Sequence, residues 1–182
     1  MIWETERLFL RVLNESCAEV VLQYYSRNKE FLKSWEPVKS DEFYTLEFQR
    51  GILKQEMENI QNGKALRFWI FKKSEPDKAI GAVGFNNIIR GAFDSCHLGY
   101  KLDQNEVNRG YISEAIRKGI EVMFNEYKLH RIEANIMPRN KASLRVVEKL
   151  GFYNEGLAYK YLKIAGKWED HIHMVLRNEA ME

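Results

Sequence analysis

The sequence predicts an α/β (α+β) fold, a mixed central sheet of about seven strands with helices on both faces. Three observations support this prediction: an early strand followed by two helices, three consecutive strands in the middle of the chain, and alternation of helix and strand thereafter. The chain has 182 residues, of which 45% are hydrophobic, so it can bury one sizeable core. Because no repeat, low-complexity tract or linker interrupts it, residues 1–182 are expected to form a single domain.

The elements of the first half follow from the spacing of apolar residues. Leu8, Leu10 and Val12 alternate as in a strand. Two helices are predicted at 15–27 and 43–62, joined by an aromatic loop, and the second ends at Asn62-Gly63. Strands are predicted at 66–72, 79–89 and 96–102, with turns at 74–77 and 90–92.

The second half alternates between the two periods. Ile112, Ile116 and Ile120 recur at helical spacing, and Ile132, Ala134 and Ile136 alternate in a strand that Pro138 closes. A second helix begins at Asn140, which is suited to cap it, and stops at Gly151. Two further strands, at 153–164 and 167–176, flank Ala165-Gly166.

Composition limits the classes of partner. The formal charge of +2 is too small to indicate direct binding of nucleic acid, and no apolar run approaches the roughly 20 residues of a membrane span. The N-terminus has no basic-then-apolar signal region, so a cytoplasmic protein without a membrane partner is expected. Cys17 and Cys96 are interpreted as reduced, packed thiols rather than a disulfide.

The segment 108–113 indicates an anion site at a helix start. Gly110 permits a tight turn, and the free amides of the first helical turn attract an anion, reinforced by the helix dipole. Arg109 and Ser113 add a positive charge and a hydroxyl donor. A plain helix N-terminus is the alternative interpretation.

A composite of motifs resembles one family over nearly the whole chain. The strings are Thr5-Glu6-Arg7-Leu8-Phe9-Leu10-Arg11, Arg109-Gly110-Tyr111, Leu129-His130-Arg131-Ile132-Glu133-Ala134, Asn140-Lys141-Ala142-Ser143 and Glu148-Lys149-Leu150-Gly151-Phe152. Together they are similar to the GNAT acyl-CoA-dependent N-acetyltransferases, in particular to the Rim-type ribosomal-protein alanine N-acetyltransferases. The resemblance implies a fold whose two central strands splay apart to admit the cosubstrate acetyl-CoA, with no metal.

The resemblance also implies how acetyl-CoA is held. Backbone amides of Asn108, Arg109, Gly110, Tyr111, Ile112 and Ser113 would bind the pyrophosphate, and the strand Gly99, Tyr100, Lys101 and Leu102 would pair with the pantetheine arm. An amide near Tyr100 would face the thioester oxygen. Asn108 stands where many relatives have glycine, so it must tolerate that glycine's dihedral angles. Asn140 would touch the cofactor arm. Lys149, with Arg139, Lys141 and Arg145, would meet the 3′-phosphate or form an exposed charged face.

The implied catalytic residues are Ser143 and Tyr100. Many GNAT enzymes carry a tyrosine acid where this chain has Val147, so Ser143 becomes the candidate partner of the departing thiolate. The tyrosine side chain of position 100 is equally well interpreted as core. Rim-type enzymes can use a glutamate base where this chain has Leu162. The substitutes considered are Glu30, Glu36, Glu114, Tyr100 and His97.

The missing carboxylate bears on the acceptor. Freeing a lysine amine of pKa about 10.4 at pH 7 costs about 4.6 kcal/mol, whereas an α-amine near 8 costs about 1.4 kcal/mol. A protein N-terminal α-amine is therefore the preferred acceptor, with a small-molecule amine or a non-catalytic acyl-CoA-binding module as alternatives. Trp35 and Glu36 are the candidates for substrate contact. His171 and His173 are interpreted as a solvated strand face rather than metal ligands, and a homodimer is left open.

Overall fold

The computed structural model describes residues 1–182. Eight strands form one mixed sheet in the order β1-β2-β3-β4-β5-β6-β8-β7. Their bounds are Ile2–Glu4 (β1), Leu8–Arg11 (β2), Leu66–Lys72 (β3), Glu75–Ile89 (β4), Ser95–Leu102 (β5), Arg131–Ile136 (β6), Tyr153–Ile164 (β7) and Lys167–Arg177 (β8). All neighbours pair antiparallel except β5 and β6, which are parallel. The predicted mixed sheet is confirmed.

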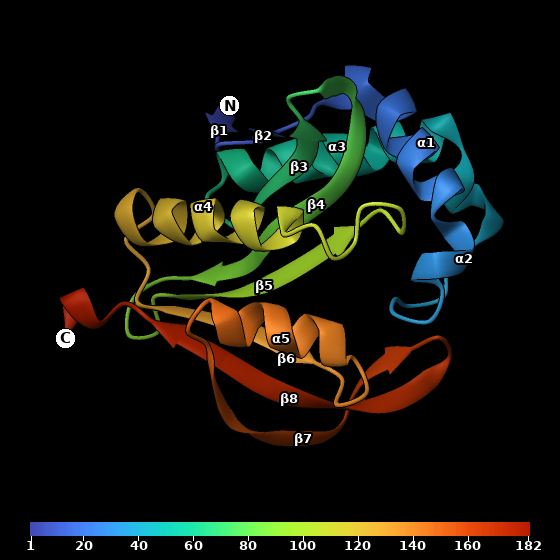
Figure 1. Cartoon of the computed structure of the whole chain (residues 1–182). Coiled ribbons are helices and arrows are strands. Elements are labelled where there is room, and N and C mark those ends of the chain that lie inside the picture. The colour runs from blue at the N-terminus through green and yellow to red at the C-terminus, as the bar shows by residue number, and fades with distance from the viewer.

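Helices cover both faces of this sheet. They are α1 (Ala18–Arg27), α2 (Lys29–Leu32), α3 (Leu46–Gln61), α4 (Tyr111–Asn125) and α5 (Lys141–Lys149), with 3-10 turns η1 (Glu15–Cys17), η2 (Asp41–Tyr44) and η3 (Glu179–Met181). In Figure 1, α4 and α5 lie in front of the sheet, whereas α3 lies behind β3 and β4. None of the helices combines the length and apolar composition needed to cross a membrane.

The alternation of strand residues divides the core into two clusters. Phe68 and Ile70 on β3 belong to the larger cluster, which includes residues of α4 and α5. Trp69 and Phe71 point to the opposite face and pack with α1 and α3. Burial on both faces explains why β3 reads as a continuous apolar run rather than a half-polar strand.

Four details differ from the sequence predictions. Ile2–Glu4 adds a short eighth strand at the sheet edge, paired with β2. The loop expected around residue 31 contains the short helix α2, and the two helices before β3 each begin with a 3-10 turn. The turn expected at 74–77 is tighter, because β4 begins at Glu75, directly opposite Lys72.

Cys17 and Cys96 are both free thiols, as expected.

The strands β5 and β6 part from each other after a short parallel contact. Their register covers only Ser95 to His97 opposite Arg131 to Glu133. The last five residues of β5 pair with β4 on one side and with no strand on the other. The splay implied by the family resemblance is therefore present in this chain, and it leaves backbone groups of β5 free to meet a ligand.

Candidate active site

The loop before α4 has the backbone geometry of an anion site. Asn108 and Gly110 both take left-handed conformations, with φ of 62° and 79°. No side chain caps α4, and its first backbone bond is donated by the Glu114 amide to the Gly110 carbonyl. The amides of Tyr111, Ile112 and Ser113 thus precede the first helical bond and are free for a ligand. The structure brings the predicted segment 108–113 together at one helix end, and Asn108 does adopt a glycine-like angle.

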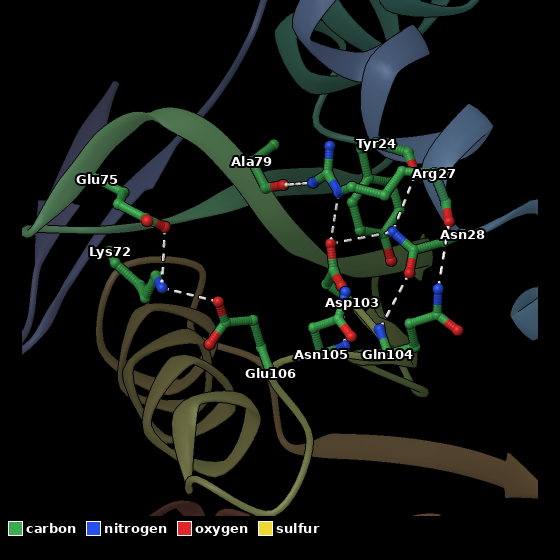
Figure 2. A network of polar contacts seen from close by, with 10 residues as sticks. All are labelled: Tyr24, Arg27, Asn28, Lys72, Glu75, Ala79, Asp103, Gln104, Asn105 and Glu106. Atoms are coloured by element: carbon green, nitrogen blue, oxygen red, sulfur yellow. Dashed lines mark hydrogen bonds and ion pairs between the residues drawn. The ribbon is translucent and has the colours of Figure 1, made fainter.

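A buried polar network holds the base of this loop (Figure 2). Asp103 is fully buried, and its carboxylate accepts hydrogen bonds from Arg27 Nε at 2.6 Å, from Asn28 Nδ2 at 3.2 Å and from the Asn105 amide at 2.9 Å. The Gln104 amide in turn donates to Asn28 Oδ1. Burial raises the pKa of Asp103, but these hydrogen bonds outweigh burial and hold the pKa below its ordinary value.

A buried ion pair and a hydrogen bond from Arg7 fix the far end of the loop. Glu106 is buried and accepts from Lys72 Nζ at 2.7 Å, and Lys72 also pairs with Glu75 (Figure 2). Arg7 donates to the Arg109 carbonyl at 2.9 Å and stacks on the Tyr111 ring. Sequence reasoning missed the Lys72–Glu106 and Arg7–Arg109 contacts, because contacts between residues so distant in sequence leave no local signal.

The start of α5 lies close to β5 through one side chain. Asn140 caps the helix, accepting a hydrogen bond from the Ser143 amide at 3.2 Å. Tyr100 Oη lies 2.6 Å from Ser143 Oγ and donates to the Ser143 carbonyl at 2.9 Å. Val147, one turn later, is fully buried. The two residues predicted to be catalytic are thus in direct contact, on the sheet face that α4 and α5 cover.

Tyr100 is excluded as the general base by its surroundings. Burial raises the pKa of its hydroxyl well above the ordinary value. A neutral phenol can donate a proton or a hydrogen bond but cannot take a proton from an amine. Tyr100 is therefore suited to support Ser143, not to replace the missing carboxylate.

The opposite face of β5 carries a chamber. A cavity of about 230 Å³ is lined by Gly99, Tyr100 and Lys101 of β5 and by Glu36, Arg67, Ala82 and Gly84. Gly99 forms the floor of this cavity, and a Cβ built on it would meet no atom within 4 Å, so the space above Gly99 is empty. Lys101 Nζ donates to Glu36 Oε1 at 2.6 Å and to Tyr25 Oη at 3.0 Å. The Lys101 side chain therefore lies on the chamber side of the sheet. Only the Lys101 backbone can contact a ligand in the gap between β5 and β6.

Two segments hold the loop after α2, which carries the chamber residue Glu36. The Ala165 amide, in the turn between β7 and β8, donates to the Glu36 carbonyl at 3.1 Å. Arg139 donates to the Ser34 carbonyl at 2.9 Å, stacks on the Trp35 ring and pairs with Glu169 at 3.4 Å. Arg139 therefore joins the loop after α2 to β8. One interpretation of the sequence had instead placed Arg139 on the exposed charged face of α5. Lys141, Arg145 and Lys149 remain exposed on α5.

Most of the substitutes considered for the base have other partners. Glu114 accepts from Thr5 Oγ1 and from Arg7 Nε, and these bonds outweigh burial to hold its pKa below the ordinary value. The side chain of Glu30 is 80% exposed. Glu36 is paired with Lys101 and Lys39. Leu162, where the resemblance would place a glutamate, is exposed and lies directly opposite Glu169.

One interpretation of the sequence is wrong. His171 is 3% exposed and so does not belong to a solvated face, and His173 is half-buried against Glu133. Tyr161 of β7 packs on both imidazoles, with ring centroids 5.7 and 5.0 Å away. No three His, Cys, Asp or Glu side chains gather in a metal-binding arrangement.

Residues 7–153 match the family model of the acetyltransferase (GNAT) domain. The chain belongs to this family. The Bacillus subtilis "Probable N-acetyltransferase YjcK" is 40% identical over 94% of both proteins. The Escherichia coli "[Ribosomal protein uS5]-alanine N-acetyltransferase" is 37% identical, over 92% of this chain and 86% of its own. The protein is accordingly an N-acetyltransferase, as the sequence resemblance predicted.

Solved structures agree with this assignment. The ribosomal-protein-S5-alanine acetyltransferase of Vibrio fischeri superposes with a TM-score of 0.94 at 37% identity, covering 100% of this chain and 99% of that one. The RimJ protein of Mycobacterium smegmatis, solved in complex with CoA-disulfide, superposes with a TM-score of 0.88 at 26% identity, covering 96% and 83%. The GNAT protein thus has the fold of the Rim-type branch.

Proposed function

We propose that this GNAT enzyme, as a single domain of residues 1–182, transfers acetyl from acetyl-CoA to the N-terminal α-amine of a protein of the ribosomal-protein class. The observation that carries the proposal is the pair of sites on opposite faces of the β5–β6 splay. The uncapped amides of α4 and the free edge of β5 suit a pyrophosphate and an extended arm on one face. The chamber at Gly99 suits an acceptor on the other face.

Acetyl-CoA fits the residues that surround the first site. Asn108, Arg109, Gly110, Tyr111, Ile112 and Ser113 would bind the pyrophosphate, and Gly99, Tyr100, Lys101 and Leu102 would contact the arm through their backbone. Asn140 would lie beside that arm, and Lys149 is available to the 3′-phosphate. A β5 amide near Tyr100 would stabilise the oxyanion of the tetrahedral intermediate. Ser143, supported by Tyr100, would hydrogen-bond the departing thiolate.

The charges of the chamber favour one class of acceptor. Arg67, Lys101 and Glu36 line it; the Glu36 carboxylate is already paired with Lys101 and Lys39, and Arg67 is paired with Glu56 at 2.6 Å. A polyamine would bring several positive charges beside these cations, whereas a peptide N-terminus brings one and can lose its proton near neutral pH. Trp35 and Glu36, in the loop after α2, would contact the first residues of such a peptide.

A panel of acceptors tests the proposal. Free-thiol release would be measured with an alanine-initiated peptide, the same peptide N-terminally blocked but carrying lysine, spermidine and an amino sugar. The free N-terminus should be acetylated fastest, with kcat/KM rising through roughly pH 7.5 to 8.5 as the α-amine deprotonates. Equal rates on the blocked lysine peptide, or reaction only with spermidine or the amino sugar, would contradict the proposed acceptor but not the acetyltransferase assignment.

A further inference from the structure

The sheet face opposite α5 carries a row of polar side chains beside the splay. On the α5 side, β6 and β8 bury Ile132, Ala134 and Met174 in the core. Asn135 and His173 alternate to the other face, where they lie directly opposite each other on β6 and β8. The β5–β6 pairing ends at His97 and Glu133, so Asn135 stands on the part of β6 that has left β5. The Gly99 floor of the chamber lies on the corresponding part of β5.

Glu133 fixes the orientation of the His173 ring. Its Oε1 lies 2.8 Å from His173 Nδ1, and its Oε2 accepts from Arg131 at 3.1 Å. Burial raises the pKa of Glu133, but the Arg131 bond and neighbouring positive charge outweigh it and keep the carboxyl ionised near neutral pH. An ionised carboxylate only accepts, so the imidazole proton lies on Nδ1. The lone pair of a neutral His173 ring is then on Nε2.

Two polar atoms at this place have no partner. His173 Nε2 and Asn135 Oδ1 are both buried and make no hydrogen bond. Burial of an unpaired acceptor is costly, and a cluster of such acceptors at a functional cleft indicates a ligand that brings donors. An amine brings two or three N–H groups, which matches two acceptors on adjacent strands.

A bulge in β7 places the Tyr161 ring over these two atoms. Between Ala158 and Leu162 the register with β8 shifts, and Lys160 takes φ of 48°. The Asp170 carboxylate accepts from the Lys160 amide at 2.9 Å and so holds the bulge. The Tyr161 ring then lies over His173, with its hydroxyl 3.5 Å from Asn135 Nδ2. Tyr161 is 36% exposed, so a rotation of its ring can admit a substrate.

We propose that His173 takes the proton from the attacking amine, with Glu133 as its positioning residue and Asn135 Oδ1 as a second acceptor for the amine. This deepens the proposed function and rests on it. The amine lone pair forms the N–C bond to the thioester carbonyl, and the C–S bond breaks to release the CoA thiolate. The amine proton passes to His173 Nε2, and solvent or Ser143 returns a proton to the sulfur. His173 thereby serves where the glutamate of the Rim-type branch is replaced by Leu162.

The test compares His173→Ala with wild type, using the alanine-initiated peptide, or spermidine if that peptide is inert. At pH 7 the variant should lose about 100-fold in kcat/KM, in the range typical of general-base catalysis. The loss should shrink toward pH 9, where an α-amine is deprotonated without a catalytic base, and added imidazole should restore activity. The titratable and charged groups around His173 are Glu133 and Tyr161, which contact it, Arg131 and His97, which contact Glu133, Glu155, which pairs with Arg131, and His171, which packs on Tyr161.

Controls separate this role from a structural one. His130→Ala removes an imidazole paired with Glu182 near the C-terminus and should keep wild-type kinetics. If His173→Ala does not fold, His173→Gln should show the same pH-dependent loss, because glutamine fills the site without a basic nitrogen. A wild-type rate in the folded variant, or a loss that neither imidazole nor high pH relieves, would overturn the proposal. A choice of spermidine over peptide would bear only on the acceptor class.

Discussion

Tyr100 Oη lies 2.6 Å from Ser143 Oγ while donating its own proton to the Ser143 carbonyl, 2.9 Å away. Because the phenol has one proton, the short contact is then a bond from the serine hydroxyl to the tyrosine oxygen. Ser143 thus holds a proton next to the start of α5, and a small rotation of its hydroxyl can present that proton to a new acceptor. A thiolate forming at the splay would be such an acceptor.

Replacing the two partners singly and together should show that they act as a unit. Ser143→Ala and Tyr100→Phe should each lower kcat at least tenfold with little change in acetyl-CoA affinity, because a thiolate partner matters mainly as charge develops on sulfur. The kcat of the double variant should fall little below that of the worse single variant, because the effects of substitutions in one hydrogen-bond chain are not additive. Single-turnover kinetics and calorimetry measure both quantities. Tyr159→Phe, at a 77% exposed ring, is the matched control. Fully multiplicative losses would show that the contact has no catalytic role.

The turn before α4 should be sensitive to a side chain at Gly110. Gly110→Val should weaken acetyl-CoA binding at least tenfold, about 1.4 kcal/mol, because φ of 79° is strained for a β-branched residue. An added Cβ would also lie 3.3 Å from Arg7 Nη2. Asn108→Gly is the control, since glycine accepts the φ of 62° freely and should keep or improve affinity. Calorimetry checks both variants, and unchanged binding in a folded Gly110→Val protein would remove this loop from the cofactor site.

The Asp103 network should make stability depend on acid pH. The folded-state pKa of Asp103 is lowered, so its contribution is fully present above the unfolded value near 4 and is lost as pH falls through the folded value. Asp103→Asn should therefore cost about 2–3 kcal/mol at pH 7, roughly 5–10 °C in Tm, and the difference from wild type should narrow as the pH falls below about 4. Thermal melts followed by circular dichroism would show this. Asp77→Asn, at an exposed position, should follow wild type at every pH, and a constant gap for Asp103→Asn would contradict the assigned ion pair.

Much of the fold could be predicted because its signals are local. The period-2 alternation of β6, the Asn140 cap and the Gly151 stop each lie within a few residues, and the structure has all three. The turn before α4 was predicted the same way, since glycine and asparagine at left-handed positions can be recognised from residue type. β1 was missed because three residues at a sheet edge carry too short a pattern.

The rest of the site depends on contacts between distant strands. Arg27 meets Asp103, and Glu133 meets His173, only after the sheet has formed. The His171 interpretation failed because alternation identifies two faces but does not say whether a polar face is solvated or covered. Here the bulge at Lys160 turns Tyr161 over that face, and a two-residue shift of register cannot be read from residue types alone.

Arg139 should control the acceptor site without touching acetyl-CoA. Its guanidinium joins the Ser34 carbonyl, the Trp35 ring and Glu169, and so holds the loop after α2 against β8. Arg139→Ala should free this loop and raise KM for a peptide acceptor several-fold, because a mobile loop must be ordered when the peptide binds. Trp35→Ala should do the same if the indole contacts the peptide. Steady-state kinetics with varied peptide concentration and calorimetry with acetyl-CoA measure the two affinities separately. Arg50→Ala, at an exposed position of α3, is the control. Arg139→Ala could instead weaken the binding of acetyl-CoA and leave the peptide KM unchanged. That result would show that the Arg139 side chain contacts the 3′-phosphate and that the loop after α2 does not depend on it.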